Sequence, residues 1–226
     1  MLPASYFAFE GGILIYSWLL EILQTEYELV RRMKESDRGG VYLIRHRTDG
    51  KPLVLRHFTG NAEVYQKLLH YTCSNLPVTL EVASQGEEHL ILEEYIQGDT
   101  LDFLLKDTLF TAKETRKIVT QVCRALWVLH SLGAVHRDVK PDNIILRGSE
   151  AVLIDFDAAR LYKPEETADT QILGTTGFAA PEQYGLSQTE QRTDIFAVGV
   201  LINVMLTGKH PSKKLAEGRM GRIVTR

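Results

Sequence analysis

Several features that assign a protein to a specialised class are scarce in this chain of 226 residues. It has two cysteines, Cys73 and Cys123, which provide neither the spacing of a metal site nor a disulfide framework. Cys123 falls on the apolar side of a predicted helix, so we expect a buried, reduced thiol. The formal net charge of -3 gives no support for nucleic-acid binding through bulk electrostatics. What remains is the composition of an ordinary soluble globular protein.

A long hydrophobic run is also missing. The most apolar stretch, Gly11–Leu20, is shorter than the roughly 20 residues that a membrane span needs. Glu10 and Glu21 bracket it and no basic region precedes it, so it lacks the features of a secretory signal. We therefore expect a packed terminal helix or strand within an N-terminal extension (residues 1–23), no membrane segment in this chain, and a cytoplasmic protein.

The first part of the chain has the pattern of a β-sheet with one short helix. Runs of β-prone residues occur at Tyr27–Val30, Val41–Arg45, Leu53–Arg56, Val78–Val82 and His89–Glu93. The sequence Arg47-Thr48-Asp49-Gly50 predicts a hairpin turn, and the Gly86 region predicts another. Ala62–His70 has the apolar spacing of a helix.

From Gly98 onward the pattern becomes helical. Thr111-Ala112-Lys113-Glu114 is a capping box that begins a helix, and Gly133 is placed to end it. The segment Ile195–Leu206 is apolar nearly all round, which predicts a helix buried on every side. Strands followed by helices indicate an α+β arrangement, with a cleft at the junction near Glu94–Gly98.

One loop gathers the residues best suited to chemistry. His136-Arg137-Asp138-Val139-Lys140-Pro141-Asp142-Asn143 combines a carboxylate, a lysine and an amide, and Asp155 follows downstream in Leu153-Ile154-Asp155-Phe156-Asp157. Carboxylate and amide oxygens suit magnesium, a hard cation that shares its ligands with substrate phosphates. The loop therefore indicates a phosphoryl-transfer site, where positioning and charge neutralisation supply most of the catalysis.

This phrase resembles the catalytic loop and metal-binding segment of the protein kinase family, and the resemblance covers most of the chain. It implies a bilobal protein-kinase fold, with a small β-rich N-lobe (residues 1–96) and a mainly helical, incomplete C-lobe (residues 97–226). Asp138 matches the base that orients the substrate hydroxyl and accepts its proton. Lys140 matches the lysine that steadies the transferred phosphoryl group in serine/threonine kinases. Asn143 and Asp155 match the two Mg²⁺ ligands.

The resemblance also implies an ATP site: Val41, Val54 and Ile145 around the adenine, backbone groups of Glu94 to Ile96 along its edge, Gly39 in the phosphate loop, Arg56 near the phosphates and Glu63 as the partner of Arg56. Glu93 matches the position that guards the back of this pocket. A carboxylate there should be paired or solvated, because an isolated buried charge is costly.

Four positions depart from the family pattern. Arg56 replaces the β3 lysine, which is not a conservative exchange. Only Gly39 remains of the three phosphate-loop glycines, so the backbone has less freedom to approach phosphates. Glu63 lies one residue before the expected position of the partner glutamate, Val64. Asp157 replaces the glycine of D-F-G, where it restrains the segment, adds a metal contact or is a plain turn residue.

The segment from Asp155 to Glu182 resembles an activation segment. Thr175 would bridge to the catalytic aspartate and lysine. Thr167 and Thr170 are candidate phosphorylation sites, and Arg137 is suited to pair with a phosphate on either.

The chain ends earlier than the resemblance to protein kinases implies. Family members continue past the buried helix with several more helices, including an arginine that pairs with Glu182, whereas this chain stops at Arg226. We expect truncation rather than an abbreviated lobe, because a lobe missing a layer would expose apolar surface. Asp194, at the start of the buried helix, matches an aspartate that holds the catalytic-loop backbone. A helix N-cap is the other interpretation, and both can hold together.

The leading hypothesis is a serine/threonine protein kinase of bacterial type. It would use ATP and Mg²⁺ to phosphorylate protein substrates or itself, with no nucleic-acid partner. A pseudokinase that binds nucleotide or a partner is the alternative, supported by Arg56 and the altered phosphate loop. A small-molecule kinase of the aminoglycoside phosphotransferase type fits less well, because that family lacks this Lys-Pro phrase and activation segment.

Overall fold

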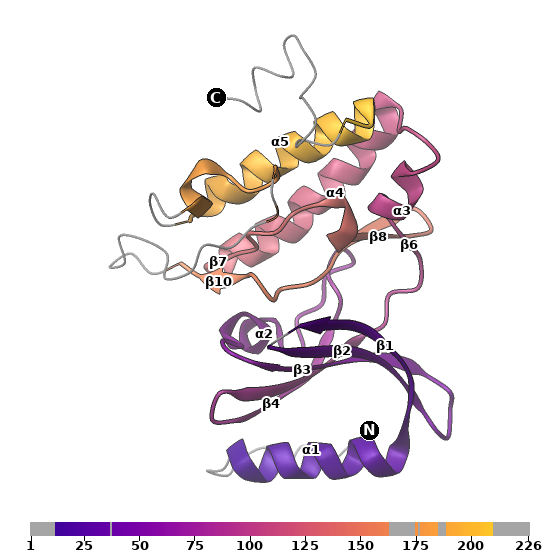
Figure 1. Cartoon of the computed structure of the whole chain (residues 1–226), viewed down its shortest axis with the longest axis vertical. Coiled ribbons are helices and arrows are strands. Elements are labelled where there is room, and N and C mark those ends of the chain that lie inside the picture. The colour runs from indigo at the N-terminus through magenta and orange to yellow at the C-terminus, as the bar shows by residue number, and fades with distance from the viewer. Residues whose placement is uncertain (1–11, 37, 163–174, 176, 185–188, 210–226) are drawn as a thin grey trace. The chain divides into compact units, whose positions relative to one another are not determined.

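The computed structural model describes residues 12–36, 38–162, 175, 177–184 and 189–209. The chain forms two compact units (Figure 1). The first comprises the chain up to Tyr71 together with Val78–Tyr95, and the second comprises Thr72–Pro77 and the chain from Ile96 onward. Among the helices within the described ranges, none combines the length and apolar character that crossing a membrane requires.

The first unit is built on an antiparallel five-stranded sheet in the order β1-β2-β3-β5-β4. Its strands are β1 (Tyr27–Ser36), β2 (Gly39–His46), β3 (Pro52–Thr59), β4 (Thr79–Gln85) and β5 (Glu88–Glu94). All five predicted strands are confirmed, although β1 continues six residues beyond its predicted end. The hairpin turn before β3 is confirmed as well: Gly50 has a φ of +70°, and its N–H donates to the His46 carbonyl at 2.9 Å.

Helix α1 (Gly12–Glu26) closes one face of this sheet. Its Tyr16 and Leu19 pack against Ala83 of β4 and Leu90 of β5, so the apolar terminal stretch is a helix rather than a strand. The Tyr16 hydroxyl donates to Glu88 at 3.1 Å. Figure 1 shows α1 lying along the sheet within this unit.

The opposite face of the sheet contacts a second helix of the unit, α2 (Glu63–Leu68). Side chains alternate between faces along a strand, so Leu55, which packs against α1, lies opposite to its neighbour Arg56. The guanidinium of Arg56 instead lies over the ring of Tyr65, a buried residue of α2. Helices α1 and α2 therefore contact different faces.

The second unit is mainly helical. Its helices are α3 (Leu101–Leu105), α4 (Ala112–Ser131) and α5 (Gln191–Thr207). Strands β6 (Asp99–Thr100), β8 (Ile144–Arg147) and β9 (Glu150–Leu153) form one small sheet, and β7 (Ala134–Val135) pairs with β10 (Arg160–Leu161). The described part of the unit also contains two short 3-10 helices, η2 (Pro141–Asn143) and η3 (Pro181–Tyr184). The predicted capping box at the start of α4 is present in full, and Gly133 after its end has a φ of +77°.

Helices α4 and α5 supply much of the core of this unit. Helix α4 buries Val122, Ala125, Leu126 and Leu129 along one side. Cys123 lies one residue round the helix from that side and is exposed, so the prediction of a buried thiol is wrong. The predicted buried helix is confirmed as α5 along most of its length, but Ile195, near its beginning, is 56% exposed.

Candidate active site

A single buried carboxylate anchors the catalytic loop, which runs from β7 to η2. Asp194 of α5 has no exposed surface and accepts backbone N–H bonds from His136 at 3.0 Å and Arg137 at 2.8 Å. It also contacts Nε2 of His130 on α4 at 2.8 Å. The N-cap of α5 is Glu190, so Asp194 is not the cap, and the prediction that it holds the loop backbone is confirmed.

The loop is held from its other side by Gln183, a residue of η3. Its Nε2 donates to the carbonyl oxygen of Arg137 at 2.8 Å, and its Oε1 accepts from the N–H of Ala180 at 3.0 Å. Arg137 has a φ of +69°, a conformation that persists in a non-glycine residue only when its surroundings enforce it. Sequence reasoning misses this role of Gln183, because the only signal is a polar residue after Ala180-Pro181-Glu182.

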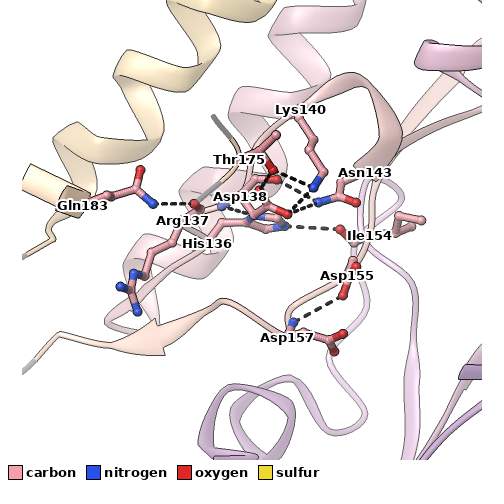
Figure 2. A network of polar contacts seen from close by, with 10 residues as sticks. All are labelled: His136, Arg137, Asp138, Lys140, Asn143, Ile154, Asp155, Asp157, Thr175 and Gln183. Atoms are coloured by element: carbon pink, nitrogen blue, oxygen red, sulfur yellow. Dashed lines mark hydrogen bonds and ion pairs between the residues drawn. The ribbon is translucent and has the colours of Figure 1, made fainter. Parts of the chain in front are cut away.

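Arg137, whose backbone is strained, positions the next residue, Asp138. Three side chains contact the carboxylate of Asp138 (Figure 2). Oδ1 of Asp138 accepts a hydrogen bond from the Thr175 hydroxyl at 2.7 Å. Oδ2 lies 2.7 Å from the ammonium nitrogen of Lys140 and accepts from Nδ2 of Asn143 at 2.9 Å. Lys140 also donates to the Thr175 hydroxyl at 2.8 Å, so the predicted bridge through Thr175 is confirmed. The side chains of Asp138 and Lys140 remain 17% and 20% exposed, which leaves the carboxylate within reach of a substrate.

A backbone hydrogen bond links the segments that carry the two predicted metal ligands, Asn143 and Asp155. The N–H of Ile154 donates to the carbonyl oxygen of Asn143 at 2.9 Å, which brings the next residue, Asp155, beside the loop. The hydrogen bonds of the Asn143 side chain all leave from Nδ2, toward the backbone and carboxylate of Asp138. That assignment presents Oδ1 as the atom for a cation. Asp155 has a φ of +70°, and its Oδ1 accepts the N–H of Asp157 at 3.4 Å.

This donor set fits magnesium better than a metal that needs several protein ligands. Within the described ranges, no group of three or more histidine, cysteine or acidic side chains is placed to hold an ion. One amide oxygen and one carboxylate are what Mg²⁺ takes from proteins when substrate phosphates and waters complete its octahedron.

The residues predicted to bind nucleotide are distributed over both units. Gly39, Val41, Val54 and Arg56 lie on β2 and β3 of the first unit, and Glu94 ends β5. Ile96 is buried at the start of the second unit's main segment, and Ile145 is half-buried on β8. Gly39 is required by packing: with a φ of +146°, a Cβ there would lie 2.0 Å from the carbonyl oxygen of His57 on β3.

The predicted pair of Arg56 and Glu63 is not what the contacts show. Nε of Arg56 donates to Oε2 of Glu93 on β5 at 2.6 Å. Glu63 instead accepts a hydrogen bond from Nδ2 of Asn61 at 3.0 Å. The expectation that Glu93 is paired rather than isolated is therefore confirmed.

Parts of the activation segment and the chain end fall outside the described residues, including the candidate phosphorylation sites Thr167 and Thr170 and the final stretch to Arg226. Where the segment is described again, Glu182 accepts a hydrogen bond from the Thr193 hydroxyl at 2.7 Å. That contact links η3 to the first turn of α5.

Comparisons with known proteins agree with this geometry. The family model "Protein kinase domain" matches residues 27–224. Serine/threonine-protein kinase D of Synechocystis is 31% identical over 179 residues, which cover 76% of this chain and 34% of that protein. Probable serine/threonine-protein kinase PknB of Corynebacterium glutamicum is 33% identical over 166 residues, 71% of this chain and 26% of that protein. Serine/threonine-protein kinase PknA of Nostoc is 29% identical over 181 residues, 76% of this chain and 32% of that protein.

The chain spans about a third or less of the length of these curated relatives. The family match nevertheless covers most of both units, including β1 to β5 and the whole network around Asp138, and leaves out α1. The chain therefore belongs to the protein kinase family and is similar to its bacterial serine/threonine members.

Proposed function

We propose that this chain is a serine/threonine protein kinase that transfers the γ-phosphate of ATP to serine or threonine hydroxyls of a protein, itself included. The observation that carries the proposal is the closed contact set of Asp138, Lys140, Asn143 and Thr175. A carboxylate, a cation and an amide fixed together on one side of a loop suit phosphoryl transfer, because that reaction depends on positioning and charge balance.

Asp138 would orient the substrate hydroxyl and accept its proton. Its Oδ1 already accepts a hydrogen bond from an aliphatic hydroxyl, that of Thr175, at 2.7 Å. A general base must lie within this reach of the proton that it takes. Because Oδ2 is bound by Lys140 and Asn143, Oδ1 is the oxygen that we assign to the substrate.

Lys140 would balance the negative charge on the transferred group. Its ammonium lies between the Asp138 carboxylate and the Thr175 hydroxyl, and both contacts restrict its position. A preorganised cation stabilises developing charge without reorganising during the reaction. A lysine at this position favours serine or threonine as the acceptor, in agreement with the named relatives.

We further propose Mg²⁺ as the metal, held by Oδ1 of Asn143 and the carboxylate of Asp155. When bound, the ion would neutralise charge on the phosphates of ATP. Protein substrates, the absence of a nucleic-acid partner and a cytoplasmic location stay predictions from the sequence.

The test is transfer of labelled phosphate from ATP and Mg²⁺ to the chain itself or to a generic protein substrate. We expect Asp138→Ala to abolish transfer. Asp142→Ala is the matched control, because Asp142 lies in the same loop, is exposed, and should leave the rate unchanged. A wild-type chain that binds ATP but transfers nothing would favour the pseudokinase alternative. Equal activity in Asp138→Ala and wild type would reject the assignment of the base.

A further inference from the structure

The sheet register of the first unit makes Arg56 and Glu93 diagonal neighbours. Val54 of β3 stands opposite Glu93 of β5, and Arg56 stands opposite Ile91. Residues two apart on a strand share a face, so Arg56 and Glu93 project from the same side of the sheet. Diagonal positions of this kind are separated by roughly 7–8 Å at the backbone, which long side chains can bridge.

The two side chains meet in a buried ion pair. Nε of Arg56 lies 2.6 Å from Oε2 of Glu93, and the side chains are 7% and 3% exposed. A short charge-assisted bond shielded from water constrains a guanidinium far more than a surface pair does. Tyr65 of α2, itself 1% exposed, places its ring centroid 5.9 Å from the guanidinium carbon. The Glu93 carboxylate and the Tyr65 ring thus restrict where the guanidinium of Arg56 can lie above the sheet.

The carboxylate on helix α2, that of Glu63, contacts a residue close to it in the sequence. Glu63, the only acidic residue of α2, receives a hydrogen bond from Nδ2 of Asn61, while the N–H of Glu63 donates to Oδ1 of Asn61 at 2.7 Å. These two contacts close a small ring at the beginning of the helix. Helix α2 contributes an aromatic surface to Arg56 through Tyr65, and β5 contributes the charge.

We propose that Glu93 is the positioning residue of Arg56, and that Arg56 held in this way binds the phosphates of ATP. This inference rests on the proposed kinase function and deepens it. The cation and its partner carboxylate both lie on strands of one sheet, joined by the β3–β5 ladder. Nucleotide binding in this chain therefore does not require a carboxylate delivered by α2, because neither partner of the ion pair belongs to that helix.

The test compares Glu93→Gln with the matched control Glu63→Gln in the full chain. Calorimetry gives the Kd for ATP with Mg²⁺, and phosphate transfer gives KM for ATP and kcat. We expect Glu93→Gln to raise both Kd and KM about tenfold, the effect of losing one charge-assisted hydrogen bond. Glu63→Gln should stay within about twofold of wild type, as a replacement at a locally bonded site does.

A second variant separates positioning from structural support. The exchanged pair Arg56→Glu with Glu93→Arg keeps an ion pair on the same face but moves the cation to β5. We expect its urea midpoint to lie closer to that of wild type than the midpoint of Glu93→Gln does, while its affinity for ATP stays low. The exchanged pair also provides the result if Glu93→Gln does not fold.

Three outcomes would overturn the inference. In the first, Glu63→Gln weakens ATP binding and Glu93→Gln does not. In the second, the exchanged pair recovers both stability and affinity, which makes the pair structural only. In the third, the wild-type chain does not bind ATP, and the proposed function fails as well. If the wild-type chain binds ATP but transfers no phosphate, the proposed kinase function fails while the inference about Glu93 can still be tested. The Kd for ATP then shows whether Glu93 supports nucleotide binding.

Discussion

Replacing Gln183 with leucine should loosen the loop that carries Asp138. The Gln183 side chain is 2% exposed and joins the N–H of Ala180, at 3.0 Å, to the carbonyl oxygen of Arg137, at 2.8 Å. Leucine fills a similar volume, so the main loss is two hydrogen bonds. At roughly 1 kcal/mol for each bond, with a further penalty for buried backbone groups that lose a partner, the free energy of unfolding should fall by about 2–4 kcal/mol. Native domains have about 5–15 kcal/mol, so the variant should still fold.

The activity of this variant should fall further than its stability. Arg137 holds a φ of +69° between Asp194 on its nitrogen side and Gln183 on its carbonyl side. Without the second contact the strained residue can relax, and a displacement of about 1 Å at the adjacent Asp138 can reduce a rate on the order of a hundredfold. The measurements are urea unfolding followed by circular dichroism, and phosphate transfer per folded molecule.

A matched replacement controls for the change of side-chain chemistry. Gln191 is exposed at the start of α5, and Gln191→Leu should change the free energy of unfolding by no more than about 0.5 kcal/mol. If Gln183→Leu unfolds at the same urea concentration as wild type and transfers phosphate at the same rate, Gln183 does not hold the loop, and the reasoning is refuted.

Three further changes test other parts of the structure by urea unfolding. Gly39→Ala should cost at least about 2 kcal/mol, because of the φ of +146° and the facing carbonyl; Gly50→Ala, with open space around it, should cost only about 1 kcal/mol, and equal losses would contradict the packing argument. Asp194→Ala should cost at least about 3 kcal/mol, because two buried backbone N–H groups lose a charged acceptor, and a smaller loss would show that the loop is held elsewhere. Hydrogen bonds from Thr111 lower the pKa of Glu114, so its stabilising effect is complete above the unfolded-state pKa and is lost as pH falls through the lower folded-state pKa. The difference between wild type and Glu114→Gln should therefore be present at about pH 7 and shrink below about pH 4, and a difference independent of pH would contradict this origin.

Much of the sheet could be predicted because the pattern of each inner strand can be recognised in its own short stretch of sequence. Alternation and a glycine turn identify β2 and β3 without knowledge of their partners. The second half of β1, from Arg31 to Ser36, could not be found in this way. Every one of its residues is exposed, so pairing with β2 leaves no apolar alternation in the sequence. Sequence patterning alone does not decide between a helix and a strand for α1, because its partners, Ala83 and Leu90, are distant in the sequence.

In the candidate site, too, residues within one motif could be predicted, whereas those that depend on distant contacts could not. Asp138, Lys140 and Asn143 lie within a few residues of one another, so a motif is enough to identify them, and the family pattern added Thr175. The partner of Arg56 depends on the register between β3 and β5, strands separated by a helix and another strand. Glu63 is the only acidic residue of the helix where the family pattern places a glutamate, although the spacing itself points to Val64. The role of Gln183 depends on how its segment folds back on Arg137, and a single sequence does not encode that contact as a recognisable motif.

The packing of α1 has a consequence for the order in which the chain can fold during synthesis. Leu19 is made before its partner Leu90, which follows 71 residues later. At about 5–20 residues per second, the apolar side of α1 waits roughly 4–14 seconds before the strand that covers it leaves the ribosome's catalytic centre. During that interval Tyr16 and Leu19 lack the partners that bury them in the folded unit. The contact between α1 and the sheet can therefore form only after β4 and β5 have been made.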